Sequence, residues 1–358
     1  MTGRTRTILA VGGLAASGAA LYGLSRWLNY HPRRIEQVDV GDWSRHPLLT
    51  PGQVIKVLTF NIQFSAGTDY QFFYEGGPDS LVREDDVRQT AHRIGEYLSQ
   101  EQPDLILLQE VDVRSKRTAY LNQIRLLADA LPAELKSSVS TYYWRSRFVP
   151  HPKIWGPVAT KLVVFSRFRI SAARRFQLPL TPGDPLVREF GFRRAFLELE
   201  LPLTTGRRFF VLNTHLEAFP GNSPVMQWQV SALLKRLQAL SDAKVPWLLG
   251  GDFNLLPPGQ YLTLSPEDRG PHTDSLELAM LFDRYSGVPR PADAVSPDQS
   301  KFYTYCRPTA SGRKPARTLD YLFSSENVRL QDYAVRQQGT ASLSDHFPVA
   351  ATYRLLPA

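Results

Sequence analysis

The sequence predicts an α/β layered sandwich, and three observations support this fold class. Short segments throughout the chain have the composition of β-strands, and several are continuously apolar, as expected for strands buried on both faces. Between them lie segments whose apolar residues recur at spacings of three and four, the pattern of amphipathic helices. From about Pro51 onward there is no further composition shift, repeat or low-complexity run, which favours one domain.

Strands and helices are expected in mixed order along the chain. The clearest helical patterns cover residues 85–100 and 223–240. Apolar runs bounded by turn residues predict strands at 54–62, 104–111, 160–166, 195–203, 207–216, 247–253, 302–306, 318–323 and 346–355.

Composition excludes some classes of protein and leaves others open. The 358 residues are 43% hydrophobic and 21% charged, which excludes disordered and collagen-like chains. The single cysteine, Cys306, has no partner for an internal disulfide and no companions for a zinc cluster. A formal net charge of +8 favours an acidic partner such as nucleic acid or an anionic membrane.

The first thirty residues have the composition of a targeting segment. Arg4 and Arg6 precede residues 7–24, an uncharged stretch near the lower limit for spanning a bilayer, and Arg26 and Trp27 follow it. We expect an uncleaved membrane anchor; a cleaved signal peptide and a buried helix are the alternatives. The expected organisation is an anchor or signal segment at 1–30, a linker at 31–50 and a globular domain at 51–358. Export of this domain across the membrane is expected, although positive charge on both sides of the uncharged stretch does not fix its orientation.

Polar side chains occupy the ends of several predicted strands. A single carboxylate at a strand end is usually a turn former or a helix cap, but strand ends are also where α/β folds assemble their sites. Because so many chemically versatile residues share this placement, we expect them to lie together. They are Asn61, Glu110, His215, Asp252, Asn254, Asp320, Asp345 and His346.

The motifs around these residues carry a family resemblance. FNIQ, LLQEVD, NTHLEA, GGDFN, LDYLF and SDHFPV occur in this order over about residues 54–355. The series resembles that of the endonuclease/exonuclease/phosphatase superfamily, the deoxyribonuclease I-like metal-dependent phosphohydrolases. The resemblance implies a four-layer sandwich, in which two mainly antiparallel β-sheets pack face to face with helices outside. It also implies that residues 51–358 form a catalytic domain.

Phosphate-ester hydrolysis explains the metal-ligating residue types. A hard divalent cation neutralises charge on the phosphoryl oxygens, and Mg²⁺ needs only one or two carboxylates because it retains several waters. The resemblance makes Glu110 and Asn61 the metal pair, and Asp345 is expected at a second or alternative metal position. The expected cofactor is Mg²⁺, with Mn²⁺ as an alternative.

The remaining motif residues suit proton transfer and phosphate binding. Asp252 and Asn254 lie two apart on a strand and so point to the same face, where a carboxylate can orient water and an amide can donate to phosphate. His215 and His346 titrate near neutrality in the absence of perturbation. The resemblance assigns Asp320 the task of orienting His346, and it leaves open whether Asp252 or His346 is the general base.

An aromatic and basic stretch, residues 142–156, has two interpretations. Its interleaved rings and cations suit base stacking with phosphate contacts, or equally a lipid interface. Arg145 and Trp155 are therefore expected to bind substrate. The structural alternative is a packed strand followed by a solvated loop.

These observations predict a membrane-tethered, metal-dependent phosphodiesterase. Nucleic acid is the expected substrate, which would make the protein a nuclease. The alternatives are a sphingomyelinase-like or other phospholipid or phosphoinositide phosphoesterase, and a catalytically silent binding module. The expected partners are the phosphate-ester substrate and the membrane, and no protein partner is inferred.

Overall fold

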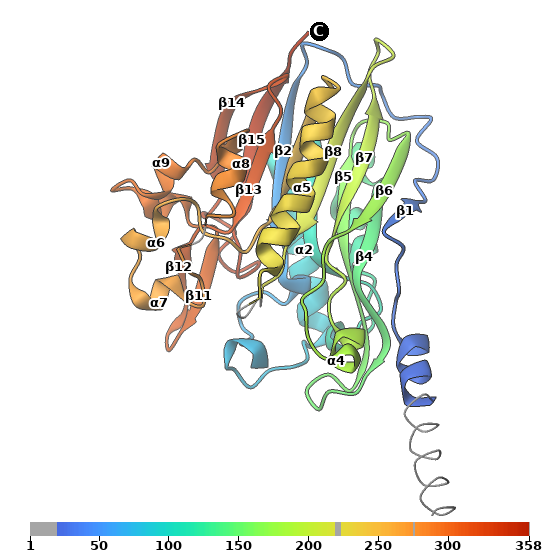
Figure 1. Cartoon of the computed structure of the whole chain (residues 1–358), viewed down its shortest axis with the longest axis vertical. Helices are drawn as coiled ribbons and strands as arrows, with labels where there is room; N and C mark the ends of the chain where they lie inside the picture. The colour runs from blue at the N-terminus through green and yellow to red at the C-terminus, as the bar shows by residue number, and fades with distance from the viewer. Residues whose placement is uncertain (1–19, 219–222, 275, 358) are drawn as a thin grey trace, which may run out of the picture.

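Two β-sheets packed face to face form the centre of the computed structural model, which describes residues 20–218, 223–274 and 276–357 (Figure 1). The seven-stranded sheet has the order β1 (Ile35–Val38), β6 (Ala172–Gln177), β7 (Ala195–Pro202), β8 (Arg208–His215), β9 (Trp247–Asp252), β13 (Asp320–Ser324), β10 (Ser286–Val288). The six-stranded sheet has the order β14 (Val328–Val335), β15 (Val349–Leu355), β2 (Val54–Asn61), β3 (Leu105–Asp112), β5 (Gly156–Ser166), β4 (Ser138–Val149).

Strand pairing is antiparallel except at one place in each sheet. β2 pairs with β3, and β8 pairs with β9, in parallel. Each parallel pair is joined by a long helix, because parallel strands need a crossover connection. These helices are α2 (Glu84–Glu101) and α5 (Val225–Asp242).

The two long helices cover opposite outer faces, which gives four layers (Figure 1). α2 buries Val87, Ala91, Ile94 and Leu98, which recur at helical spacing. Three acidic residues in its first turn stabilise the helix because they lie at the positive end of its dipole. α5 packs against the seven-stranded sheet through residues such as Leu233 and Leu237. The predicted mainly antiparallel four-layer sandwich is confirmed.

Successive side chains of a central strand point to opposite faces of its sheet, and both faces are buried, which explains why these strands are mostly apolar. Leu105 and Leu107 of β3 belong to the core between the sheets, whereas Ile106 and Leu108 belong to the core beneath α2. Both faces of the strand are therefore buried. Gly250 keeps the sheets close, because a Cβ there would lie 3.0 Å from a methyl carbon of Leu107 in the other sheet.

Shorter elements complete the fold. A hairpin of β11 (Tyr305–Thr309) and β12 (Gly312–Arg317) stands apart from both sheets. Besides helical residues 20–28, the described part of the chain has the shorter helices α3 (Gln123–Ala130), α4 (Pro185–Phe190), α6 (Gln260–Thr263), α7 (Pro266–Arg269), α8 (Ala279–Phe282) and α9 (Pro291–Ala294). The 3₁₀ turns are η1 (Gln63–Ser65), η2 (Phe73–Glu75), η3 (Lys116–Thr118), η4 (Ala133–Leu135) and η5 (Gln299–Phe302).

Two expectations about local structure were inaccurate. The strand expected at 302–306 begins only at Tyr305, because Phe302 ends η5 and the next two residues are irregular. The segment expected as a linker, 31–50, contains β1, which pairs with β6, and contributes Trp43 and Leu49 to the core. Part of this segment is therefore built into the sandwich.

The predicted N-terminal anchor lies largely outside the described residues. Its described remainder is helical over residues 20–28. Within residues 20–218, 223–274 and 276–357, no helix has both the length and the apolar character needed to cross a bilayer.

Candidate active site

The predicted site residues meet where both sheets present the carboxyl ends of their parallel pairs. Asn61 is the last residue of β2, and Glu110 lies near the end of β3. His215 and Asp252 end β8 and β9 and are direct neighbours across that parallel ladder. Each sheet therefore delivers one pair of functional side chains to the same place.

A β-bulge directs Glu110 into the site. The pairing of β3 with β5 shifts register between Leu108 and Val111, and Glu110 has a φ of 58°. A bulge changes the face to which the following side chains point. Gln109 consequently lies in the buried core, while the carboxylate of Glu110 is half-buried at the cavity surface.

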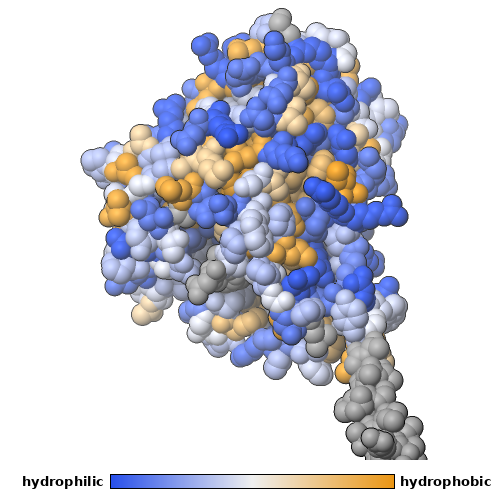
Figure 2. All heavy atoms as spheres, viewed as in Figure 1, coloured by the Kyte–Doolittle hydropathy of each residue, from blue (hydrophilic) through white to orange (hydrophobic). Residues whose placement is uncertain are grey.

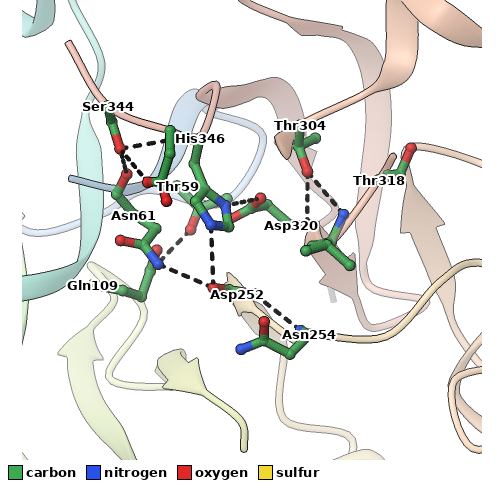
Figure 3. Close-up of polar contacts among 12 residues, drawn as sticks. Thr59, Asn61, Gln109, Asp252, Asn254, Thr304, Thr318, Asp320, Ser344 and His346 are labelled. Atoms are coloured by element: carbon green, nitrogen blue, oxygen red, sulfur yellow. Dashed lines mark hydrogen bonds and ion pairs between the residues drawn. The ribbon is translucent and has the colours of Figure 1, made fainter. Parts of the chain in front are cut away.

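Asn61 connects the two sheets through its side-chain amide (Figure 3). Its Nδ2 donates to Glu110 Oε1 at 3.2 Å and to Asp252 Oδ2 at 3.0 Å. Its Oδ1 accepts a hydrogen bond from the backbone N–H of Gln63 at 3.0 Å. The amide nitrogen, rather than the oxygen expected to ligate a metal, thus faces the carboxylates, and the metal-ligating role of Asn61 stays a prediction.

Asp320 and His346 form a buried pair beside Asp252 (Figure 3). His346 Nδ1 lies 2.7 Å from Asp320 Oδ2, and His346 Nε2 lies 3.8 Å from Asp252 Oδ2. Burial alone would lower the pKa of His346, but the carboxylates of Asp320 and Asp252 outweigh it and raise that pKa to about 10. The contact implied by the family resemblance is present.

His215 is held neutral on the other side of Asp252. Its Nε2 lies 3.3 Å from Asp252 Oδ2, and its ring meets Tyr143 edge-on at 5.4 Å. Burial, reinforced by the positive charges of Arg194 and His346, lowers the pKa of His215 well below its usual value. The two histidines therefore differ in charge. Carboxylates outweigh burial at His346, whereas burial and the nearby positive charges dominate at His215.

Asn254 and Asp345 complete the predicted set. The backbone N–H of Asn254 donates to Asp252 Oδ1 at 2.9 Å, which fixes that carboxylate from a second direction. Asp345 Oδ1 accepts from Ser344 Oγ at 3.2 Å. Burial raises the pKa of Asp345 to about 6, although His346 and Arg313 oppose this shift.

These side chains open into a cavity of about 630 Å³. Asn61 and Asp320 lie behind its wall and support the groups in front. The predicted residues that line it are Glu110, His215, Asp252, Asn254, Asp345 and His346. Its remaining wall includes the rings of Phe72, Phe73, Tyr74, Tyr143, Trp144, Phe192 and Tyr305 and the guanidinium groups of Arg117, Arg194, Arg307 and Arg317.

The two predicted substrate-binding residues do not line this cavity. A register shift in β4 between Tyr142 and Trp144 turns Arg145 outward, where its guanidinium lies 4.8 Å from the centre of the Tyr142 ring. Trp155 is 59% exposed on the β4–β5 turn, although its neighbour Ile154 reaches the cavity. Direct substrate contact by Arg145 and Trp155 is not supported by their positions.

The donor set at the cavity fits a hard divalent cation. Glu110 and Asp345 both contribute carboxylates to the cavity lining, and oxygen donors are what Mg²⁺ prefers. A second group, formed by Asp252, Asp320 and His346, has candidate ligand atoms within 4.8 Å of one another. In that group His346 Nδ1 is already bonded to Asp320, so Glu110 and Asp345 are the better candidates.

Comparison with known proteins identifies the family. The model of the Endonuclease/Exonuclease/phosphatase family matches residues 58–346, most of the chain. The chain belongs to this family. Its members are divalent-metal-dependent hydrolases that act on phosphate esters. A comparison with curated protein sequences gave no significant match.

Solved structures of endonuclease/exonuclease/phosphatase proteins share the fold. An endonuclease/exonuclease/phosphatase from Beutenbergia cavernae has 22% identity and a TM-score of 0.59, with 86% of this chain and 72% of that chain covered. The human Nocturnin catalytic domain with bound sulfate anion has 20% identity and a TM-score of 0.50, with 86% of this chain and 97% of that chain covered. TDP2 from C. elegans has 16% identity and a TM-score of 0.51, with 85% of this chain and 76% of that chain covered.

Two arginines at the cavity were not predicted from the sequence. Arg194, 2% exposed, lies over the rings of Phe192 and Tyr143, and its Nε and Nη1 have no hydrogen-bond partner among the described residues. Arg117 is held by Asp112 and lies 3.6 Å from the centre of the Phe64 ring. Nothing in the sequence distinguishes them from the many surface arginines, because their burial results from tertiary packing.

Proposed function

We propose that this chain is a divalent-metal-dependent phosphodiesterase. The observation that supports this most directly is the convergence on Asp252 of Asn61, His215 and His346, beside Glu110 and at the base of one cavity. Hydrolysis of a phosphate ester needs a group that takes a proton from water and donors that stabilise charge on the phosphoryl oxygens. This arrangement contains both.

The protein's own residues have separable tasks in this proposal. Asn61 and the Asn254 backbone hold the Asp252 carboxylate, and Asp320 holds the positively charged His346 beside it, so that Asp252 takes up the water proton. His215 and the Asn254 side chain face the cavity as neutral hydrogen-bonding groups for the phosphoryl oxygens.

A divalent cation, Mg²⁺ or alternatively Mn²⁺, would be held by Glu110 and Asp345. When bound, it would neutralise phosphoryl charge and polarise the ester. Asn61 would take part directly only if its amide turned its oxygen toward Glu110. In the present arrangement Asn61 acts as a donor that restrains both carboxylates.

The preferred substrate is an unpaired nucleic-acid segment or chain end. Aromatic walls suit the stacking of bases, and buried arginines suit phosphates. Tracking of a duplex is less well supported, because Arg313 is buried in an ion pair with Glu75, and Lys314 pairs with Asp268. These two cations are therefore already paired with carboxylates.

A phospholipid diester is the second candidate. The observation that favours it is the exposed Trp155, whose neighbour Ile154 lines the cavity, so that an apolar side chain stands beside the opening. We also propose that residues 1–30 tether the protein to a membrane and that the catalytic domain is exported. The uncharged stretch at 7–24 supports this location.

An activity screen of the purified protein tests the proposal. Single-stranded DNA, duplex DNA, RNA, sphingomyelin vesicles and phosphomonoesters are compared with Mg²⁺, with Mn²⁺ and with excess chelator. We expect metal-dependent cleavage of single-stranded nucleic acid above duplex. Hydrolysis of vesicle lipid alone selects the second candidate, and full activity in chelator contradicts the proposed mechanism.

A further inference from the structure

A surface next to the cavity opening combines exposed apolar and basic side chains. We call it the mouth rim and define it as residues 20–34, the β4–β5 segment 145–155 and residues 184–190 around α4. Its exposed apolar side chains are Leu21, Tyr22, Leu24, Trp27, Trp155 and Val187. Val187 is 72% exposed and Trp27 is 62% exposed, so most of the surface of each side chain faces solvent.

The three segments of the mouth rim are joined by direct contacts. Asn29 forms a β-bridge with Ser146, and the Arg147 guanidinium lies 4.5 Å from the centre of the Trp27 ring. Glu189 at the end of α4 pairs with His31. The N-terminal residues are therefore fixed against the edge of the six-stranded sheet and against α4.

Two segments of the mouth rim, 145–155 and 184–190, adjoin residues that line the cavity. Tyr143 and Trp144 precede the β4–β5 segment and line the cavity, as does Ile154 within that segment. Gly191 and Phe192 follow α4 and also line it. A flat partner lying on the mouth rim would consequently lie beside the cavity opening.

The charge of the mouth rim is strongly positive. Its acidic residues are Asp184 and Glu189, and Glu189 is buried in ion pairs with Arg26, His31 and Arg193. Basic side chains outnumber them, and all of these basic side chains are exposed. They are Arg26, Arg33, Arg34, Arg145, Arg147, Lys153 and Arg188.

We propose that the mouth rim lies on an anionic lipid bilayer and brings the cavity opening to its surface. Aromatic side chains with adjacent cations are the composition that settles at the headgroup boundary of anionic membranes. The described chain begins at residue 20, within the mouth rim, and hydrophilic and hydrophobic residues lie side by side on the surface near this point (Figure 2). The sequence of the preceding residues 7–19 contains no charged residue. The inference rests on the proposed membrane tether and is independent of the identity of the cleaved bond.

Depth-dependent quenching on the full-length chain tests this arrangement. Single cysteines replace Trp155, Val187 or, as a control, Thr205, and the buried native Cys306 is changed to Ala. Thr205 is exposed on the turn before β8, at the opposite end of that strand from His215. Each variant carries a fluorophore and is mixed with phosphatidylcholine vesicles containing phosphatidylserine and a lipid-borne quencher.

We expect strong quenching at positions 155 and 187, little at 205, and weaker quenching when phosphatidylserine is omitted. Equal, weak quenching at all three positions in protein that floats with the vesicles overturns the proposal but leaves the tether intact. Protein that does not float overturns both. If an oligonucleotide shifts the fluorophore emission at positions 155 and 187 and vesicles cause no quenching there, the mouth rim binds nucleic acid and the proposal is overturned. Turnover of a soluble diester by the same samples tests the proposed function separately.

Discussion

At the scale of single residues, Asp252 is the point where both sheets and both histidines meet. Its Oδ2 accepts from Asn61 of the other sheet, and its Oδ1 accepts from the backbone of Asn254. His215 and His346 approach the same carboxylate from either side. Loss of its charge should therefore affect the reaction far more than the fold.

We predict that Asp252→Asn lowers turnover by about a hundredfold or more, the scale of general acid–base catalysis. Asparagine keeps the shape of the side chain, so circular dichroism and the unfolding midpoint should stay near those of the native protein. A folded Asp252→Asn variant with near-native turnover would remove Asp252 from the mechanism.

Glu110 connects the reaction to the metal. We predict that Glu110→Gln raises the Mg²⁺ concentration needed for half-maximal rate, because an amide is a weaker ligand for a hard cation than a carboxylate. The metal dependence of the rate, measured for both proteins at saturating substrate, checks this. An unchanged metal requirement would transfer the role to another carboxylate, with Asp345 the next to test.

Arg194 brings buried, unpartnered N–H groups to the cavity. We predict that Arg194→Lys, which keeps the charge but loses the planar fork, raises KM by about tenfold or more, since hydrogen bonds to charged groups are worth about 1.5–3 kcal/mol. Arg208→Lys, at an exposed position at the start of β8, is the matched control. Equal KM values for the two variants would assign Arg194 a structural task only.

At the scale of elements, two segments from distant parts of the chain are joined beside the cavity. Glu75 of η2 and Arg313 of β12 form an ion pair at 2.9 Å that is almost fully buried. The Arg313 guanidinium also donates to the carbonyls of Tyr70 and Cys306. The loop with η2 and the β11–β12 hairpin therefore depend on one another for their positions.

We predict that Arg313→Met lowers the free energy of unfolding by about 3–5 kcal/mol, the usual cost of leaving one member of a buried pair uncompensated. Urea denaturation measures it. The double variant Glu75→Gln/Arg313→Met should recover part of the loss, because no charge is then left buried. Equal stability of the single and double variants would show that the charge of Glu75 is unimportant.

Sequence reasoning succeeded for elements buried on both faces and failed for partly exposed ones. β2, β3 and β9 consist mostly of apolar residues, and the helical spacing of α2 and α5 is regular, so their positions were predictable. β6 and β14 are rich in charged residues because one face is partly exposed, and they were missed. Bulges were also unpredictable, which is why Arg145 was expected at the cavity and lies outside it.

At the scale of the whole molecule, a polar contact crosses the core between the sheets. Gln109 of β3 donates to Asn213 Oδ1 of β8 at 2.7 Å. Asn213 Nδ2 donates to the carbonyls of Leu108 and Val163 at 2.9 and 3.0 Å. In a mainly apolar interface, such a contact specifies how the sheets are aligned, since other alignments would leave these groups unpaired.

We predict that Asn213→Leu destabilises the protein substantially, because each buried polar group left unpaired costs about 1–3 kcal/mol. Chemical denaturation measures the change, and Gln227→Leu on the exposed side of α5 is the control. A native unfolding free energy for Asn213→Leu would mean that apolar packing alone sets the alignment.

The amide of Asn61 spans the two sheets at the site in the same way as Gln109 and Asn213 do in the core. Its two hydrogen bonds end on Glu110 in its own sheet and on Asp252 in the other. The hydrogen bonds that position the two carboxylates of the site thus also link the two sheets. A substitution that keeps the shape of these side chains, such as Asp252→Asn, can therefore remove the activity alone, whereas removal of the Asn61 amide would also remove a link between the sheets.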